Sequence, residues 1–267
     1  SLCDLRLKEV VEYKDLLFLF VKRDFISVFK QTILGPLWFV IQPILTTIMF
    51  TVVFGKIAGI PTDGTPKILF YLAGLTFWNF FSINLFATSN TFIENQGIFG
   101  KVYFPRIITP LSVICSNLLK FGIQFGLFLV FYFYYMIDGA DIIPNITMLL
   151  FPYLILVTAV LSMGFGLIIT SLTTKYRDLK FLIQFGVQLW MYATPVIYPL
   201  SSLKGNLRTM ALVNPVSSII ETFKYGFLGS GTFDWAHLIY SSVFALLLLA
   251  IGIVIFNRTE QNFMDTV

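Results

Sequence analysis

Charged residues are scarce in this chain of 267 residues, since Asp, Glu, Lys and Arg together make up only 12% of it. Soluble globular domains usually carry about 25% charged residues, so the composition excludes an ordinary soluble fold. The formal net charge of +4 is small and gives no indication of nucleic-acid binding. Hydrophobic residues account for 57% of the chain, which predicts an all-α integral membrane protein formed by one transmembrane domain.

Cysteine and histidine are almost missing as well. Cys3 and Cys115 are far apart in the sequence, so we expect neither a disulfide framework nor a metal site. His237 is the single histidine, which argues against a His-based metal centre and leaves no histidine for a Ser/His/Asp set other than this one. Beside Trp235, it is interpreted as a side chain at the membrane interface.

A nucleotide-binding loop is also missing. Gly97 and the pair Gly100-Lys101 superficially suggest one, but their spacing differs from that of a phosphate-binding loop and no Ser or Thr follows the lysine. No two carboxylates are expected at one membrane depth, so an intramembrane enzyme is poorly supported and we expect no catalytic residue. An ion-coupled carrier usually buries several ionisable groups, whereas Lys120 is nearly alone in the predicted spans.

Long apolar runs predict six membrane spans, each about long enough to cross a hydrocarbon core of about 30 Å. Pro43 lies inside the first run and predicts a kink or local break there. An amphipathic helix over residues 10–31 precedes the spans and is expected to lie in the membrane interface, the alternative being a solvated helix of a small cytoplasmic cap. The predicted spans are residues 34–54, 68–90, 107–136, 147–172, 181–198 and 238–256.

The segment after the fifth predicted span, residues 199–231, is too polar to cross a membrane and too apolar for an exposed loop. Irregular backbone at membrane depth survives only where protein or a water-filled cavity satisfies it, so we expect a re-entrant hairpin. Lys and Arg are more frequent in the parts that six spans place with the two termini. The positive-inside rule therefore predicts cytoplasmic termini and an external hairpin.

Aromatic residues are abundant, with 30 Phe, 12 Tyr and 4 Trp. Trp38, Phe39, Trp190, Tyr192 and Tyr198 lie in the two spans that begin or end with helix-breaking residues. Because aromatic faces stack on the apolar C–H surfaces of sugar rings, these five are candidates to line a conduit. The alternative is ordinary packing and interfacial anchoring.

Lys120 lies deep in the third predicted span. A charge embedded in a membrane is a functional candidate by default. The preferred interpretation is a lysine that snorkels towards the interface or is paired inside the bundle.

Four blocks of sequence form a recognisable pattern, in order, along almost the whole chain. They are RDFISVFKQTILGPLWFVIQP, which contains Arg23, Gly35, Trp38 and Pro43, then NQGIFGKVYFPRIITPLS (95–112), YRDLKFLIQFGVQLWMYATPVIYP and NPVSSIIETFKYG. This pattern resembles the permease subunits of polysaccharide ABC exporters. It is most similar to the Wzm type that exports O-antigen, with teichoic-acid and capsule export permeases as near relatives.

The resemblance implies a homodimer that pairs with two copies of a separate ABC ATPase, which would carry the ATP and Mg²⁺. It implies a polysaccharide on undecaprenyl diphosphate as substrate, surrounded by membrane lipid in the bacterial cytoplasmic (inner) membrane. The first and fifth spans would line the conduit and the hairpin would shape its exit. The expected contacts to the ATPase are Arg23, Glu94, Asn95, Lys101 and Tyr103.

Further residues are expected to be structural anchors. Arg177 and Asp178 either fix the fifth span through a charge-assisted network or simply orient it. Arg23 would meet either the lipid diphosphate or anionic lipid headgroups. The other expected anchors are Gly35, Pro43, Pro195, Pro199, Asn214 and Pro215.

Two alternative functions remain open, namely a small-molecule exporter of the same fold and an intramembrane transferase.

Overall fold

The computed structural model describes residues 12–27, 34–99, 104–176 and 178–264. Over these ranges every regular element is a helix, which confirms the all-α prediction. Five helices in the described part of the chain are long and apolar enough to cross a membrane, so this is a multi-pass membrane protein. These candidate spans are Trp38–Ile57, Lys67–Ser89, Ile108–Ile137, Ile146–Thr174 and Trp235–Glu260.

Helix α4 (Lys67–Ser89) forms the centre of the bundle, and 78% of its most apolar window is buried. It contacts α6 (Ile108–Ile137), α7 (Phe151–Lys175) and α10 (Pro215–Leu228). The polar residues in its second half are expected to face other helices, because lipid offers them no hydrogen-bond partners. Asn84 confirms this expectation, since it is fully buried and accepts a hydrogen bond from Asn117 of α6 at 2.9 Å.

The long helix α11 (Trp235–Met264) packs on α7 through glycines. A Cβ atom built on Gly164 would lie 2.8 Å from the backbone nitrogen of Leu249. A Cβ atom on Gly252 would lie 2.9 Å from the carbonyl oxygen of Gly164. Gly166 approaches Thr88 of α4 just as closely. Gly164, Gly166 and Gly252 thus allow these helices to approach closely.

We expect Gly164→Ala to lower the free energy of unfolding by about 1–3 kcal/mol, because the added methyl group meets backbone atoms that cannot move aside. Gly122→Ala on α6 is the matched control, since no atom lies within 4 Å of its added Cβ. Both variants are compared by unfolding the purified protein in detergent micelles. Equal stability of the Gly164→Ala and Gly122→Ala proteins would contradict the close approach of α7 and α11.

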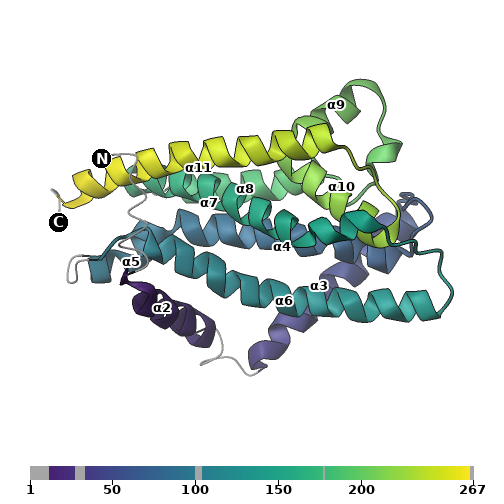
Figure 1. The fold of residues 1–267 in the computed structure, drawn as a ribbon, viewed down its shortest axis with the longest axis horizontal. Coiled ribbons are helices and arrows are strands. Elements are labelled where there is room, and N and C mark those ends of the chain that lie inside the picture. The colour runs from purple at the N-terminus through teal and green to yellow at the C-terminus, as the bar shows by residue number, and fades with distance from the viewer. Residues whose placement is uncertain (1–11, 28–33, 100–103, 177, 265–267) are drawn as a thin grey trace.

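Two ends of the bundle can be distinguished in Figure 1. The hairpin helices α9 (Gly205–Val213) and α10 lie at one end, here called the α9 end. Helices α2 (Lys14–Ser27) and α5 (Thr91–Phe99), together with the last turns of α11, lie towards the opposite end, here called the α5 end. A short 3-10 turn, η4 (Leu200–Ser202), precedes α9.

The predicted hairpin, residues 199–231, is helical rather than irregular. Its helix α9 is mostly exposed, whereas α10 is buried along nearly its whole length against α4, α7 and α11. The chain thus turns back into the bundle after α9. That this hairpin re-enters the bilayer from outside stays a prediction.

The fifth predicted span, 181–198, differs from the structure in its length. Helix α8 (Leu179–Tyr192) has only 14 residues and ends before a turn over residues 193–199. At about 1.5 Å per residue it is about 21 Å long, which is less than the hydrocarbon core. The described helices therefore do not confirm a count of six spans, although α8 contacts both α4 and α7.

The beginning of the chain contains a helix where one was expected, because α2 falls within the predicted residues 10–31. Phe20 is buried and packs edge-on against Phe104, with ring centroids 5.6 Å apart. A 3-10 turn, η1 (Gly35–Leu37), then begins at Gly35, whose φ of +49° favours glycine. It leads into α3.

The first span shows no break at Pro43, and a kink there stays a prediction. Helix α3 (Trp38–Phe50) continues past Pro43 without interruption. The irregularity comes later, as a π-helical segment η2 (Thr51–Ile57). Pro43 is buried near the middle of α3, so it is a packed residue of the helix rather than its end.

Candidate functional site

An aromatic cavity of about 520 Å³ lies between α8, the turn after it and α9. Three of the predicted conduit residues, Trp190, Tyr192 and Tyr198, line this aromatic cavity together with Asn214. Apolar side chains complete its wall, namely Leu203, Leu207, Met210, Ala211 and Val213, with Ala193 at the turn. Apolar walls with a few polar groups are typical of sites that bind ligands.

The aromatic residues of this cavity differ in how tightly they are held. The ring of Trp190 lies 6.3 Å from Trp78 and 5.2 Å from both Phe81 and Phe165, measured between centroids. Tyr192, in contrast, is 48% exposed. Trp190 is therefore fixed by packing, whereas the face of Tyr192 is open for a ligand to stack on.

Trp38 and Phe39 do not join this cavity. They occupy the first two positions of α3, where Trp38 is 44% exposed. The ring centroid of Phe39 lies 5.8 Å from the ammonium nitrogen of Lys120. The structure thus brings together three of the five aromatic candidates and places the other two at the beginning of α3.

Asn214 and Pro215 form the N-terminal end of α10. The side-chain oxygen of Asn214 accepts a hydrogen bond from the backbone N–H of Val216 at 3.1 Å, as a helix N-cap does. Pro215 fills the first helical position, where its missing N–H costs nothing. The Asn214 amide also donates to the Thr194 hydroxyl at 2.8 Å and so connects α10 to the turn after α8.

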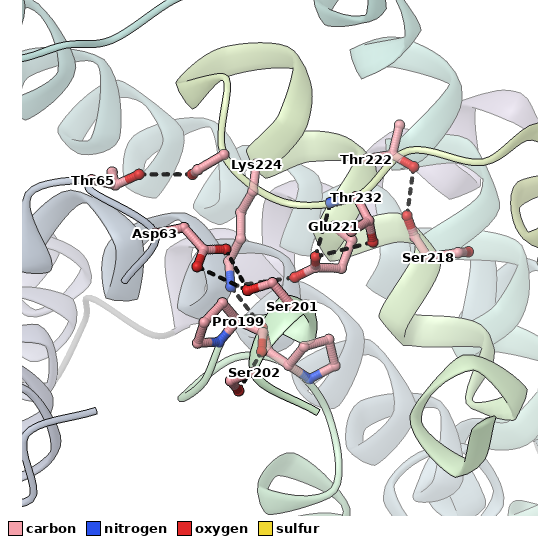
Figure 2. A network of polar contacts seen from close by, with 12 residues as sticks. Asp63, Thr65, Pro199, Ser201, Ser202, Ser218, Glu221, Thr222, Lys224 and Thr232 are labelled. Carbon is pink, nitrogen blue, oxygen red and sulfur yellow. Dashed lines mark hydrogen bonds and ion pairs between the residues drawn. The ribbon is translucent and has the colours of Figure 1, made fainter. Parts of the chain in front are cut away.

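A buried ion pair on α10 contacts the turn that follows α8 (Figure 2). The side chain of Lys224 is fully buried and that of Glu221 is 1% exposed, with 3.8 Å between the ammonium nitrogen and a carboxylate oxygen. Lys224 donates to the carbonyl oxygen of Pro195 at 2.6 Å and lies 3.6 Å from the ring centroid of Phe70. It therefore holds α10, α4 and the turn after α8 together.

Burial acts on both members of this ion pair. It lowers the pKa of Lys224 to about 8, against the opposing attraction of Glu221. Burial likewise raises the pKa of Glu221, while Lys224 and a hydrogen bond from the Thr232 backbone N–H at 3.1 Å favour its charged form. Each charge is thus stable in this position only because the other is present.

Two further contacts of the same polar network join neighbouring loops at the α9 end (Figure 2). The Ser201 hydroxyl lies 2.8 Å from both carboxylate oxygens of Asp63. The Thr65 hydroxyl donates to that of Ser230 at 2.7 Å. The loop before α4 is thereby tied to η4 and to the segment after α10. The expected anchor Pro199 contributes its carbonyl oxygen, which accepts from the Ser202 hydroxyl at 2.7 Å.

Sequence reasoning did not single out Glu221 and Lys224, although a signal was available. Opposite charges three residues apart lie on one face of a helix and can pair. In IIETFKYGF such a pair stands within an otherwise apolar segment, where unpaired charges would be costly.

A polar cavity of about 340 Å³ lies towards the α5 end, between α2, α4, α5 and α6. Its walls include three predicted ATPase contacts, Arg23, Glu94 and Asn95, and also Lys120. Asn95 is buried and its amide donates to the Thr91 carbonyl at 3.0 Å, which ties it to its own helix. Partial burial raises the pKa of Glu94, against the attraction of Lys180. Contact with an ATPase stays a prediction for all three.

Lys120 is held inside the bundle, as the preferred interpretation has it. Its ammonium group donates to the side-chain oxygen of Asn117 at 2.8 Å. The Asn117 amide nitrogen donates in turn to Asn84 at 2.9 Å. A chain of polar groups therefore links α6 to the central helix α4.

Three predicted residues lie outside the described part of the chain, namely Lys101, Tyr103 and Arg177. Asp178 directly precedes α8, where its exposed side chain makes no capping hydrogen bond. A charge-assisted network around Arg177 and Asp178 therefore stays a prediction.

Comparison with known proteins gives the chain a family. The family model for the ABC-2 type transporter matches residues 15–228. The O-antigen export system permease protein RfbA of Myxococcus xanthus is 26% identical over 262 residues, which cover 97% of this chain and 98% of that protein. A protein of the same name from Klebsiella pneumoniae is 25% identical over 252 residues, or 94% of either chain. The chain therefore belongs to the ABC-2 type transporter family, as a multi-pass membrane permease subunit.

Proposed function

We propose that this chain is the permease subunit of an ATP-driven ABC transporter that exports polysaccharide linked to undecaprenyl diphosphate, the O-antigen of lipopolysaccharide. The observation that carries the proposal is the match, over nearly the full length of both chains, to permeases named for O-antigen export. The site of action is the bacterial cytoplasmic membrane, and the direction is from the cytoplasmic leaflet outward.

The aromatic cavity at the α9 end supports a saccharide substrate. Its open side offers the exposed ring of Tyr192, and its fixed wall includes Trp190. Sugar rings present apolar C–H faces that stack on such rings without demanding one particular hydrogen-bond pattern. A wall of this kind lets a chain of many sugar units slide past, which suits the exit of a conduit.

The orientation and the number of crossings belong to the same proposal. Helix α8 and the turn over residues 193–199 would make a fifth crossing, so that the chain crosses six times. The α5 end would face the cytoplasm, because the segments expected there carry most of the Lys and Arg. Both termini would then be cytoplasmic, and α9 and α10 would face outward.

The functional assembly would be a homodimer with two copies of an ABC ATPase. The ATPase would hold ATP and Mg²⁺, since this chain has no phosphate-binding loop. Helices α2 and α5 would contact the ATPase. The exposed apolar face of α8, which includes Phe181, Leu182 and Phe185, suits burial against a second copy or lipid.

Copurification tests the assembly directly. We expect the chain to purify as a stable complex with a Walker-motif ATPase encoded beside it, and lipid-linked polysaccharide to stimulate ATP hydrolysis by that complex. The measurement is the ATPase rate with and without the lipid-linked glycan. Transport by the purified chain alone under an ion gradient would refute the proposal.

Glu94→Lys tests the contact with the ATPase. We expect the affinity for the ATPase to fall about tenfold, equivalent to about 1.4 kcal/mol, because the variant reverses a charge at the α5 end. Asp138→Lys is the matched control, because Asp138 is an exposed carboxylate at the C-terminal end of α6, far from the α5 end. Affinity is measured by titrating purified ATPase onto the permease in nanodiscs. If the Glu94→Lys protein binds the ATPase with wild-type affinity, α5 is not part of the contact with the ATPase.

A further inference from the structure

The polar cavity near the α5 end contains four charged side chains. Arg23 and Lys120 are cationic, and Asp24 and Glu94 are anionic. Arg23 is already paired with Asp24, whose Oδ1 lies 2.9 Å from its Nε and 2.8 Å from its Nη2. Lys120 differs from Arg23 in this respect, because no carboxylate in the described part of the chain comes within ion-pair distance of its ammonium group.

The ammonium group of Lys120 has unused capacity. Lysine carries three N–H donors and no acceptor. One donor binds the Asn117 side-chain oxygen, and the ring of Phe39 lies 5.8 Å away on another side. Two donors of a cation on the wall of a polar cavity are thus available to a ligand.

The direction of the polar chain leaves a second donor unused. Because Lys120 only donates, Asn117 turns its oxygen to it and its nitrogen to Asn84. The amide nitrogen of Asn84 is then left without a partner among the described residues, although it is fully buried. Buried polar groups normally have hydrogen-bond partners, so the row of polar groups Lys120–Asn117–Asn84 leaves one donor, the Asn84 amide nitrogen, unsatisfied.

Ser116 gives an independent indication on the cavity wall itself. Its side chain is 1% exposed, and its hydroxyl has no hydrogen-bond partner in the described part of the chain. A buried hydroxyl without a partner, on a residue of the same cavity wall as the Lys120 ammonium group, points to a polar group that is not part of this chain.

The depth of the cavity favours a lipid as the source of this ligand. Helix α6 has 30 residues and is about 45 Å long, which exceeds a hydrocarbon core of about 30 Å. Lys120 lies about 18 Å from the beginning of this helix, and its flexible side chain can extend from the cavity wall towards the headgroup region. The neighbouring Leu118 and Leu119 are 42% and 49% exposed and offer an apolar surface for an acyl or prenyl chain.

We infer that the polar cavity binds a phosphate group of a membrane-embedded lipid, with the ammonium group of Lys120 as its main contact and the hydroxyl of Ser116 as a donor. The guanidinium of Arg23, which stays paired with Asp24, adds a second positive charge to the cavity wall. The phosphate belongs either to the diphosphate of the exported lipid or to an anionic phospholipid. The first of these sources rests on the proposed function.

Lys120→Gln tests the inference, because glutamine keeps the hydrogen bond to Asn117 and removes the charge. The complex with the ATPase is stripped of lipid in detergent, and undecaprenyl diphosphate or phosphatidylglycerol is added back separately. Native mass spectrometry then gives the affinity for each lipid. We expect Lys120→Gln to bind at least one of them about tenfold more weakly, Lys120→Arg to restore that binding, and the exposed Lys204→Gln to leave it unchanged.

Wild-type affinity of Lys120→Gln for both lipids would overturn the inference. If that variant does not fold, Ser116→Ala decides instead, since it removes a hydroxyl that has no partner in the chain. It is expected to weaken the same lipid severalfold, and unchanged affinity would count against the site. Stimulation of the wild-type ATPase by lipid-linked glycan is recorded in parallel. If lipid-linked glycan does not stimulate the wild-type ATPase, the proposed function is refuted. If it does, and Lys120→Gln still binds both lipids with wild-type affinity, only this inference is refuted.

Discussion

Lys224→Met is expected to lower the free energy of unfolding by about 3–5 kcal/mol, because it leaves the charge of Glu221 buried without its partner. Methionine has a similar shape, so the effect reports the lost charge rather than a lost volume. The variant also loses the hydrogen bond to the Pro195 carbonyl, which positions the turn beside the aromatic cavity. The measurement is a denaturant titration of the purified protein in detergent micelles.

A double variant separates the charge effect from packing. In Glu221→Gln with Lys224→Met no charge remains buried at this position, so we expect most of the lost stability to return. Lys204→Met is the surface control, because Lys204 is exposed just before α9. If Lys224→Met unfolds at the same denaturant concentration as Lys204→Met, the ion pair does not hold the α9 end together.

Tyr192→Ala is expected to reduce the rate of polysaccharide export about tenfold, which corresponds to about 1.4 kcal/mol of lost stacking between its ring and the passing sugars. Because Tyr192 is 48% exposed, the fold should keep its stability. Trp190→Ala is a poorer test, since Trp190 packs on three other rings and its truncation would also cost about 3–5 kcal/mol of stability.

Tyr134→Ala is the matched control for Tyr192→Ala, because Tyr134 on α6 is 60% exposed and does not line the aromatic cavity. Export is measured as the appearance of glycan at the cell surface in a strain whose own copy of the permease gene is deleted. Normal export by Tyr192→Ala, at equal protein levels, would show that this ring is not part of the conduit.

The long helices were predictable because apolar runs bounded by polar or helix-breaking residues determine them. The second predicted span, 68–90, agrees with Lys67–Ser89 within one residue at either end. The last one, 238–256, is shorter than the candidate span Trp235–Glu260, because a helix continues into residues that hydropathy alone assigns to the interface.

The region after α8 was harder to predict, because hydropathy does not distinguish a helix from an apolar turn. The apolar run continues beyond Tyr192 through Val196 and Ile197, yet α8 ends at Tyr192. Pro195 was a local indication of this end, since the residue before a proline avoids helical geometry.

The burial of α10 depends on tertiary contacts that no local pattern contains. Its charged pair is tolerated because Lys224 reaches a carbonyl group in the turn after α8 and Glu221 accepts from Thr232. Tertiary contacts also decide which of the aromatic candidates lie together, while their role in a conduit stays a prediction. Trp38 and Trp190 share a residue type and a position near a helix end, but they belong to different surfaces of the bundle.

Reconstitution tests the central proposal most directly. The chain and its ATPase are placed together in vesicles with lipid-linked polysaccharide, and a lectin reports the glycan on the side opposite to the ATPase. We predict that glycan appears there only with hydrolysable ATP and only when both chains are present. Glycan transfer without ATP, or its absence with ATP and an active ATPase, would contradict the assignment of this chain as a polysaccharide export permease.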